Sequence, residues 1–213
     1  MESRGSVTRT TYVKRCTQQG IRTKLVMAAQ FRAAGFRPQF LEPADAIITI
    51  DSIQCSVECK RIQTENGLKE CVQKASSQIK KRLSQETSAK LRALIAIDIS
   101  KTVNTDGTLY FSATSSDHLS RQVDSNLEAF LKRNRTKLTS HLHSRVSAVL
   151  LYLRTRAVIE DQGGVLANFR RLFVVPSAWN DGKNKSIYQK LVNQLCRKAP
   201  KQIFERAEPL GIQ

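Results

Sequence analysis

The chain has 213 residues, 40% of them hydrophobic and 25% charged, a composition that fits one ordinary globular domain. Thirty-five Lys and Arg residues against eighteen Asp and Glu residues give a net charge of +17 and a pI near 10.1, which favours nucleic acid as a partner before an acidic membrane surface. No apolar run is long enough to span a bilayer, and residues 1–14 contain no apolar signal core. We therefore expect one cytoplasmic domain over residues 1–213, with no membrane partner and with residues 1–14 mobile.

The first third of the chain predicts a helix followed by three extended segments. Helical spacing of apolar residues covers about Thr17 to Ala34, and Pro38 to Pro43 is short and extended. The β-rich run Asp45 to Ile50 and the alternating run Ile53 to Ile62 are separated by Asp51-Ser52, a pair typical of a tight turn. The last two runs therefore predict a hairpin.

The rest of the chain alternates between predicted helices and strands. In order, these are a helix from Gly67 to about Leu83, a strand over Leu94–Ile99, a turn at Asn104–Gly107, a helix from about Ser116, strands over Val146–Val158 and Phe169–Val175 joined through Asp161–Gly164, and a helix over Ser186–Lys198 ended by Pro200. Interleaved strands and helices are typical of an α/β fold. We expect a mixed central β-sheet flanked by helices on both faces.

The strand around Glu58-Cys59-Lys60 has one charged and one apolar side. Successive side chains of a strand point to opposite faces, so Glu58 and Lys60 share a face about 6–7 Å apart. The opposite face carries only apolar residues, namely Ile53, Cys55, Val57 and Cys59. A second carboxylate, Asp45, opens the preceding strand. This basic protein places four acids between Glu42 and Glu58, which indicates that they are used, although strand ends and turns collect acids anyway.

This arrangement resembles the PD-(D/E)xK nuclease superfamily, whose fold is called restriction-endonuclease-like. Asp45, preceded by Pro43-Ala44, matches the Asp of the motif, and Glu58 and Lys60 match its Glu-x-Lys. The following helix carries Ala75-Ser76-Ser77-Gln78, similar to an Ala-x-x-Gln pattern of some members. The resemblance covers residues 18–100 and leaves 101–213 as a basic extension of the same domain. It implies a metal-dependent nuclease, with DNA as the favoured substrate and endonucleolytic cleavage expected.

The resemblance also implies how the residues are used. Mg²⁺, with Mn²⁺ tolerated, would be held by the carboxylates of Asp45 and Glu58 and by the Cys59 backbone carbonyl, which are the oxygen ligands that Mg²⁺ prefers. Lys60 would hold the attacking water and offset charge on phosphorus, and Gln78 would help to orient the water or the phosphate. The first helix lacks the Glu of many relatives, so Gln18 or Gln19 replaces it or one metal is held. No organic cofactor is expected.

Basic residues outside this motif predict a surface that follows phosphates. Each of these residues by itself could simply be a solvated surface charge. The set and the net charge together indicate nucleic-acid binding. The candidates are Arg61, Lys132, Arg133, Arg135, Lys137, Arg154 and Arg156, with Arg170 and Arg171 near a strand start. Aromatic residues are only 6%, which disfavours stacking on single strands and leaves contact with a duplex backbone.

Several alternatives stay open on the sequence alone. Glu58 and Lys60 could be an exposed ion pair on a strand of a basic, non-catalytic nucleic-acid-binding protein. The same residues could also cut RNA. A homodimer would suit an enzyme that cuts two strands, but no residue pattern indicates one.

The cysteines and histidines do not indicate a zinc site. Cys55 and Cys59 lie about 13 Å apart on an extended strand, too far for a shared tetrahedral metal. With Cys71 they are expected to be buried thiols, and the odd total of five cysteines indicates reduced thiols. His141 and His143 are expected to be solvated or to contact phosphate, and Asp98 is expected to pair with an arginine.

Overall fold

The computed structural model describes residues 21–85, 91–103, 111–160, 165–178 and 181–196. Predictions that concern residues 1–14, Gln18, Gln19, Pro200 and the turns at 104–107 and 161–164 lie outside these ranges. A helix covers residues 21–33 at the start of the described chain. The later helices are η1 (Glu65–Gly67), α2 (Leu68–Ser84), α3 (Ser100–Val103), α4 (Ser116–Thr139), α5 (Gly182–Leu191) and η3 (Val192–Cys196).

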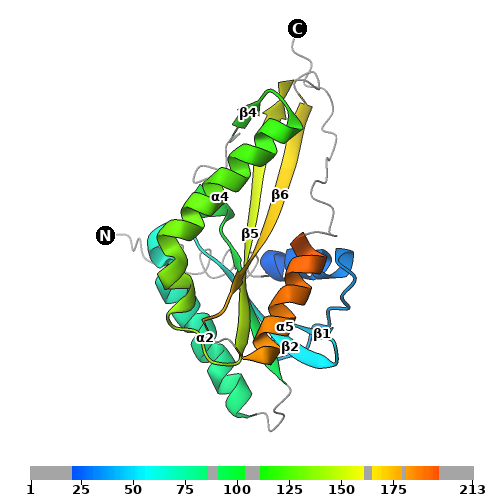
Figure 1. Ribbon diagram of the computed structural model, residues 1–213, viewed down its shortest axis with the longest axis vertical. Helices are drawn as coiled ribbons and strands as arrows, with labels where there is room; N and C mark the ends of the chain where they lie inside the picture. Colours follow the sequence, from blue (N-terminus) through cyan, green and yellow to red (C-terminus); the bar gives the residue numbers. More distant parts are fainter. Residues whose placement is uncertain (1–20, 86–90, 104–110, 161–164, 179–180, 197–213) are drawn as a thin grey trace, which may run out of the picture.

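The described strands form one mixed sheet. They are β1 (Ala46–Ile50), β2 (Ile53–Arg61), β3 (Arg92–Asp98), β4 (Phe111–Ala113), β5 (Val146–Ile159) and β6 (Val165–Pro176). The order is β1-β2-β3-β5-β4, and β6 pairs with β5. β2, β3 and β5 are parallel, whereas β1 and β6 run antiparallel to their neighbours. Figure 1 shows that β5 and β6 extend as a long ribbon beside α4. The chain is therefore an α/β protein, as predicted.

The hairpin predicted for β1 and β2 is confirmed. Ala46 pairs with Val57 and Ile50 with Ile53, so Asp51 and Ser52 form a two-residue loop. Both loop residues have positive φ values, 46° and 69°, as the type I′ turn that matches strand twist requires. The extended segment predicted at 38–43 forms a single bridge, between Gln39 and Ile47.

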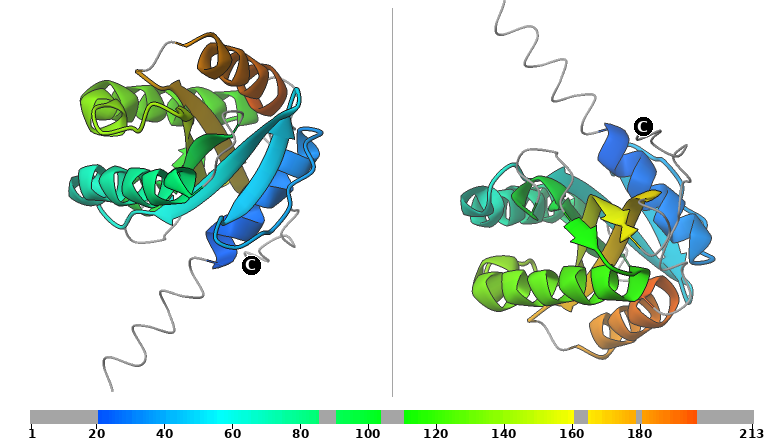
Figure 2. Two further views of the ribbon diagram at one scale, coloured as in Figure 1. Left: turned by 90° about the horizontal axis from the view of Figure 1, so that it is seen from below. Right: turned by 90° about the horizontal axis from the view of Figure 1, so that it is seen from above.

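The buried strand β3 divides the core into two clusters. All seven of its residues are buried. Ala93, Ile95 and Ile97 belong to a cluster with apolar residues of α2 and α4, two helices that lie next to each other in Figure 2. Leu94 and Ala96 belong to a second cluster with residues of helix 21–33 and α5. The helical stripes seen in the sequence are thus buried against the sheet.

Several boundaries differ from the sequence prediction. α5 begins at Gly182 rather than Ser186, because the Asp181 side chain caps it by accepting the Asn184 N–H at 2.6 Å. β3 begins at Arg92 rather than Leu94. The short elements η1, α3 and β4 were not predicted, since they carry too few residues for a periodic pattern. None of the helices in the described ranges combines the length and the apolar character that crossing a bilayer requires.

Candidate active site

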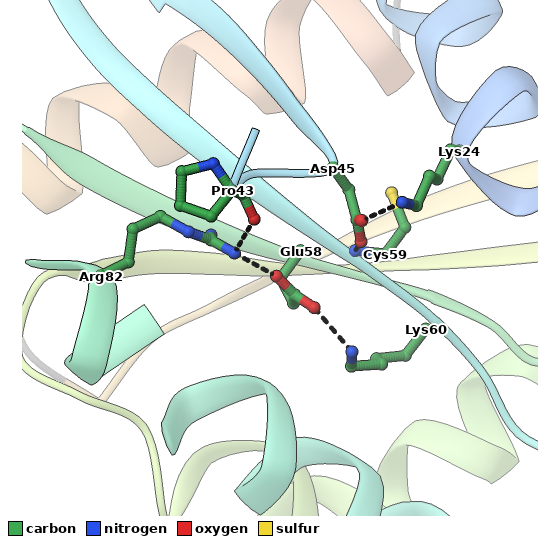
Figure 3. A network of polar contacts seen from close by, with 7 residues as sticks. All are labelled: Lys24, Pro43, Asp45, Glu58, Cys59, Lys60 and Arg82. Atoms are coloured by element: carbon green, nitrogen blue, oxygen red, sulfur yellow. Dashed lines mark hydrogen bonds and ion pairs between the residues drawn. The ribbon is translucent and has the colours of Figure 1, made fainter. Parts of the chain in front are cut away.

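Glu58 and Lys60 lie side by side on the charged face of β2. Lys60 Nζ donates to Glu58 Oε1 at 2.6 Å (Figure 3). Glu58 is only 4% exposed, because α2 packs over this face of the strand. The opposite face, with Cys55, Val57 and Cys59, is buried in the second core cluster. The predicted alternation of β2 is therefore confirmed, but the alternative of an exposed ion pair does not fit a carboxylate this deeply buried.

Arg82 of α2 is a second partner of Glu58. Its Nη2 donates to Glu58 Oε2 at 2.8 Å and to the Pro43 carbonyl at 2.7 Å (Figure 3). The Arg82 side chain is 11% exposed, and its Nε and Nη1 are buried without a hydrogen-bond partner in the structure. Burying a charge is costly unless it is paired, so the two cations make the burial of Glu58 tolerable. Arg82 also ties α2 to the segment that leads into β1.

Asp45 lies immediately before β1, as predicted. Its Oδ2 accepts the backbone N–H of Cys59 at 2.7 Å, and its Oδ1 pairs with Lys24 Nζ at 2.6 Å (Figure 3). The hydrogen bond with Asp45 raises the pKa of Lys24 above its ordinary value, so the ammonium stays charged. Lys24 belongs to helix 21–33, which therefore supplies a cation to Asp45.

The Cys59 backbone completes an oxygen-rich corner beside Asp45. In a strand the N–H and C=O of one residue point to the same side. Because the Cys59 N–H points at Asp45, its carbonyl also faces the segment that precedes β1. A hard cation could thus be offered carboxylate oxygens of Asp45 and Glu58 and the Cys59 carbonyl, which is chemistry that Mg²⁺ accepts. Within the described ranges no three His, Cys, Asp or Glu side chains gather as a metal-binding group.

Gln78 lies on α2, the helix that also carries Arg82. It is exposed on α2, four residues before Arg82 and therefore on the same side of the helix. No hydrogen bond joins it to Asp45, Glu58 or Lys60 in the described structure. Its predicted role stays a prediction.

The predicted nucleic-acid-binding residues fall in different places. Arg61, Arg154 and Arg156 line one pocket, at the carboxyl ends of β2 and β3. The other four lie near the end of α4, where Lys132 and Arg135 line a separate groove against β6 and α5. Arg133 pairs with Glu65 at 3.4 Å, and this carboxylate partly neutralises the charge of Arg133. The set is therefore not one continuous surface.

The structure also shows the partners of Asp98 and Arg171, two residues considered in the sequence analysis. Asp98 pairs with Arg61 at 3.4 Å, which confirms its pairing with an arginine. Arg171 lies in the middle of β6, not at its start, where it donates twice to Asp124 at 2.6 Å and lies over the Phe169 ring. These contacts give Arg171 a structural role.

The three described thiols and His143 are held in their uncharged forms by burial. Burial raises the pKa of Cys55 to about 12 and that of Cys71 to about 11, and it raises the pKa of Cys59 still further, so all three are protonated. His143 Nδ1 accepts the Arg145 N–H at 3.2 Å, and burial lowers the pKa of His143. His143 therefore stabilises the turn before β5 in its neutral form.

Comparison of the chain with protein-family models, with curated proteins and with solved structures found no match. The function is therefore argued from this chain's own residues and geometry.

Lys24 and Arg82 are the site residues that the sequence analysis missed. Both lie on helices, far along the chain from the carboxylates they contact. Arg82 had one available signal, its spacing of four residues after Gln78 on the same helix. Lys24 had none, because helix 21–33 carries several basic residues that the sequence does not distinguish.

Proposed function

We propose that this protein is a Mg²⁺-dependent nuclease that hydrolyses phosphodiester bonds, most favourably those of DNA, on a restriction-endonuclease-like core with helices on both faces of the sheet. The observation that supports this best is the burial of Glu58 beside Lys60, with Asp45 fixed on the adjoining Cys59 amide. A buried carboxylate held by two cations costs stability that an apolar residue would not. A catalytic use explains why it is there.

The chain's own groups have distinct tasks in this proposal. Asp45, Glu58 and the Cys59 carbonyl would hold Mg²⁺, which when bound lowers the pKa of a water and neutralises phosphate charge. Lys60 is the partner that can leave Glu58, because its side chain is 25% exposed on a flexible stem. Once free, its ammonium can orient the attacking water and offset charge on the phosphate.

Arg82 is the fixed partner. It is held by the Pro43 carbonyl as well as by Glu58, so it keeps Glu58 in place when Lys60 moves. Arg82 is therefore proposed as a positioning residue for Glu58.

One observation favours a second candidate, a nucleic-acid-binding protein without catalysis. Each of the two carboxylates is paired with a cation from the chain itself, Asp45 with Lys24 and Glu58 with Lys60 and Arg82. In that case the cluster would be a structural ion network. An RNA-cleaving enzyme would use the same residues as the DNA nuclease and differ only in substrate.

The test is cleavage of linear DNA, circular DNA and RNA, with and without Mg²⁺. We expect Asp45→Ala, Glu58→Ala and Lys60→Ala each to abolish cleavage, because each removes a group from the reacting site. The matched control is Glu70→Ala with Lys74→Ala, which removes an exposed Glu–Lys pair of α2 and should leave cleavage unchanged. Cleavage at the wild-type rate in all three site variants would overturn the proposal. Cleavage of circular DNA would identify an endonuclease.

A thermal shift separates the two candidates when no cleavage is seen. Mg²⁺ at about a hundredfold over its Kd would stabilise a metal-binding protein by about 2.7 kcal/mol, which raises Tm by several degrees. We expect this shift in the wild type and its loss in Glu58→Gln. A protein that binds only nucleic acid would show no Mg²⁺ shift and a steep salt dependence of affinity.

A further inference from the structure

A basic pocket lies where β2, β3 and the middle of β5 meet helix 21–33. Its volume is about 280 Å³. It is lined by Arg22, Arg61, Asp98, Lys101, Arg154 and Arg156, together with Tyr152 and smaller residues of the same segments. In open α/β sheets, ligands bind outside the carboxyl ends of the strands, which is the position of this pocket.

Positive charge in the pocket far exceeds negative charge. Five of the lining side chains are Lys or Arg, and Asp98 is the one acid among them. Asp98 is already engaged by Arg61 at 3.4 Å and by the Ser100 N–H at 2.9 Å. Within the described part of the chain, no carboxylate forms an ion pair with Arg22, Lys101, Arg154 or Arg156. These four cations remain for an anion from outside.

The strand register places Arg154, one of these four cations, opposite another arginine. Arg154 of β5 lies directly opposite Arg170 of β6, and like charges in this position destabilise a sheet. Arg156 follows two residues later on the same face. Burial, together with the charges of Arg22, Arg170 and Arg156, lowers the pKa of Arg154. A bound anion would relieve the repulsion among Arg22, Arg154 and Arg156.

Tyr152 gives a second, independent indication of a ligand. The residue is 4% exposed and lines the pocket, yet its hydroxyl has no hydrogen-bond partner in the structure. Leaving a buried donor unsatisfied costs about 1–3 kcal/mol. Buried Tyr hydroxyls usually find a partner, and because Tyr152 lines this pocket, a ligand oxygen bound there is a candidate for that partner.

We propose that this pocket binds a phosphate monoester, namely the terminal phosphate of a nucleic-acid strand. A monoester carries a charge of about −1.5 to −2 near neutral pH. It therefore neutralises four unpaired cations better than an internal diester, which carries a single charge. A strand end also fits a pocket of this size, whereas a duplex needs a long groove.

The pocket lies near the proposed active site but on the other face of β2. Arg61 follows Cys59 by two residues on the face opposite to Glu58 and Lys60, about 6–7 Å from Cys59, and Arg22 lies two residues before Lys24 on the same helix. This inference deepens the proposed function, on which it rests for its substrate: the enzyme would recognise a strand end and cut near it.

The test measures binding of a labelled hairpin DNA with one open end, by fluorescence anisotropy in EDTA so that no cleavage occurs. The end carries a 5′-phosphate, a 3′-phosphate or only hydroxyls. We expect a terminal phosphate to tighten binding about tenfold, the worth of one charge-assisted contact. Arg154→Gln, Arg156→Gln and Tyr152→Phe should each reduce this difference. Arg121→Gln removes an exposed arginine of α4 outside the pocket and should retain it.

The outcomes separate this inference from the proposed function. Equal affinity for all three hairpin ends overturns the strand-end assignment, even if the Lys60→Ala variant loses cleavage. An end preference that survives in every pocket variant overturns the pocket assignment. Inorganic phosphate is the second probe: if it raises Tm in the wild type but not in Arg154→Gln, while the hairpins bind equally, the pocket takes free phosphate instead. A preference for the phosphorylated end that the pocket variants lose supports the inference whether or not cleavage is found.

Discussion

Two charge clusters include residues from the end of β2, on its opposite faces, and they differ in how their charges are balanced. In the candidate active site, Asp45 and Glu58 are matched by Lys24, Lys60 and Arg82 at 2.6–2.8 Å. In the basic pocket, four cations have no carboxylate among the described residues, and one of them, Arg154, lies opposite Arg170 of β6.

The contrast indicates different demands on the two sites. A matched cluster keeps its charges oriented without a ligand, as a reacting site requires. An unmatched cluster is unstable alone and gains most when an anion arrives, as a binding site requires. Under the two proposals, chemistry and binding would lie on opposite faces of the end of β2.

Breaking the matched cluster should have the largest effect on stability. Arg82→Met removes the fixed partner of a carboxylate that is 4% exposed. Removing one partner of a buried ion pair costs about 3–5 kcal/mol, and Lys60 leaves Glu58 partly compensated, so we expect the lower end of this range. Urea unfolding measures the loss. Lys81→Met, an exposed neighbour on α2, is the control and should change stability little. An Arg82 variant as stable as this control would show that Glu58 does not depend on Arg82.

The sequence predicted the framework of this cluster because its signals are local. The two-period alternation of β2 and the position of Asp45 before β1 depend on neighbouring residues, and both are found. The α2 stripe likewise predicted the helix that covers Glu58. What periodicity reports is the face on which a side chain lies.

The cations that complete each cluster could not be predicted. Glu58 has Arg82 as its partner, 24 residues away, although Lys80 and Lys81 are adjacent alternatives on the same helix. The choice is made by the packing angle of α2 on the sheet, which no local pattern encodes. The basic pocket draws residues from four separate segments, so the sequence showed its arginines but not that Arg61 and Arg154 share a cavity while Lys132 lies elsewhere.

Relieving the unmatched cluster should have the opposite sign. Arg154→Gln removes one of two arginines that face each other in register, and cross-strand pairs of this kind are worth about 0.2–1 kcal/mol. We therefore expect the variant to be more stable than the wild type by up to about 1 kcal/mol in urea unfolding. It should do so while losing affinity for a phosphorylated end, the usual exchange of stability for function. Added phosphate should shrink the stability difference by stabilising only the wild type. A destabilised Arg154 variant would mean that this arginine has a structural partner.

The smallest expected effect comes from a matched carboxylate that takes part in neither cluster. Glu65 of η1 accepts hydrogen bonds from Asn134 at 2.7 Å and from Arg133, and these contacts lower the pKa of Glu65. Because the folded-state pKa lies below the unfolded one, this stabilisation is present above the unfolded pKa of about 4.3 and is lost as pH falls through the folded pKa. The side chain is 34% exposed, so solvent screening limits the gain to about 1 kcal/mol or less. Urea unfolding of the wild type and Glu65→Gln should therefore differ at pH 7 and converge as the pH falls below 4. Cleavage should be unchanged at pH 7, which would show that pairing a carboxylate does not by itself make it part of the reacting site.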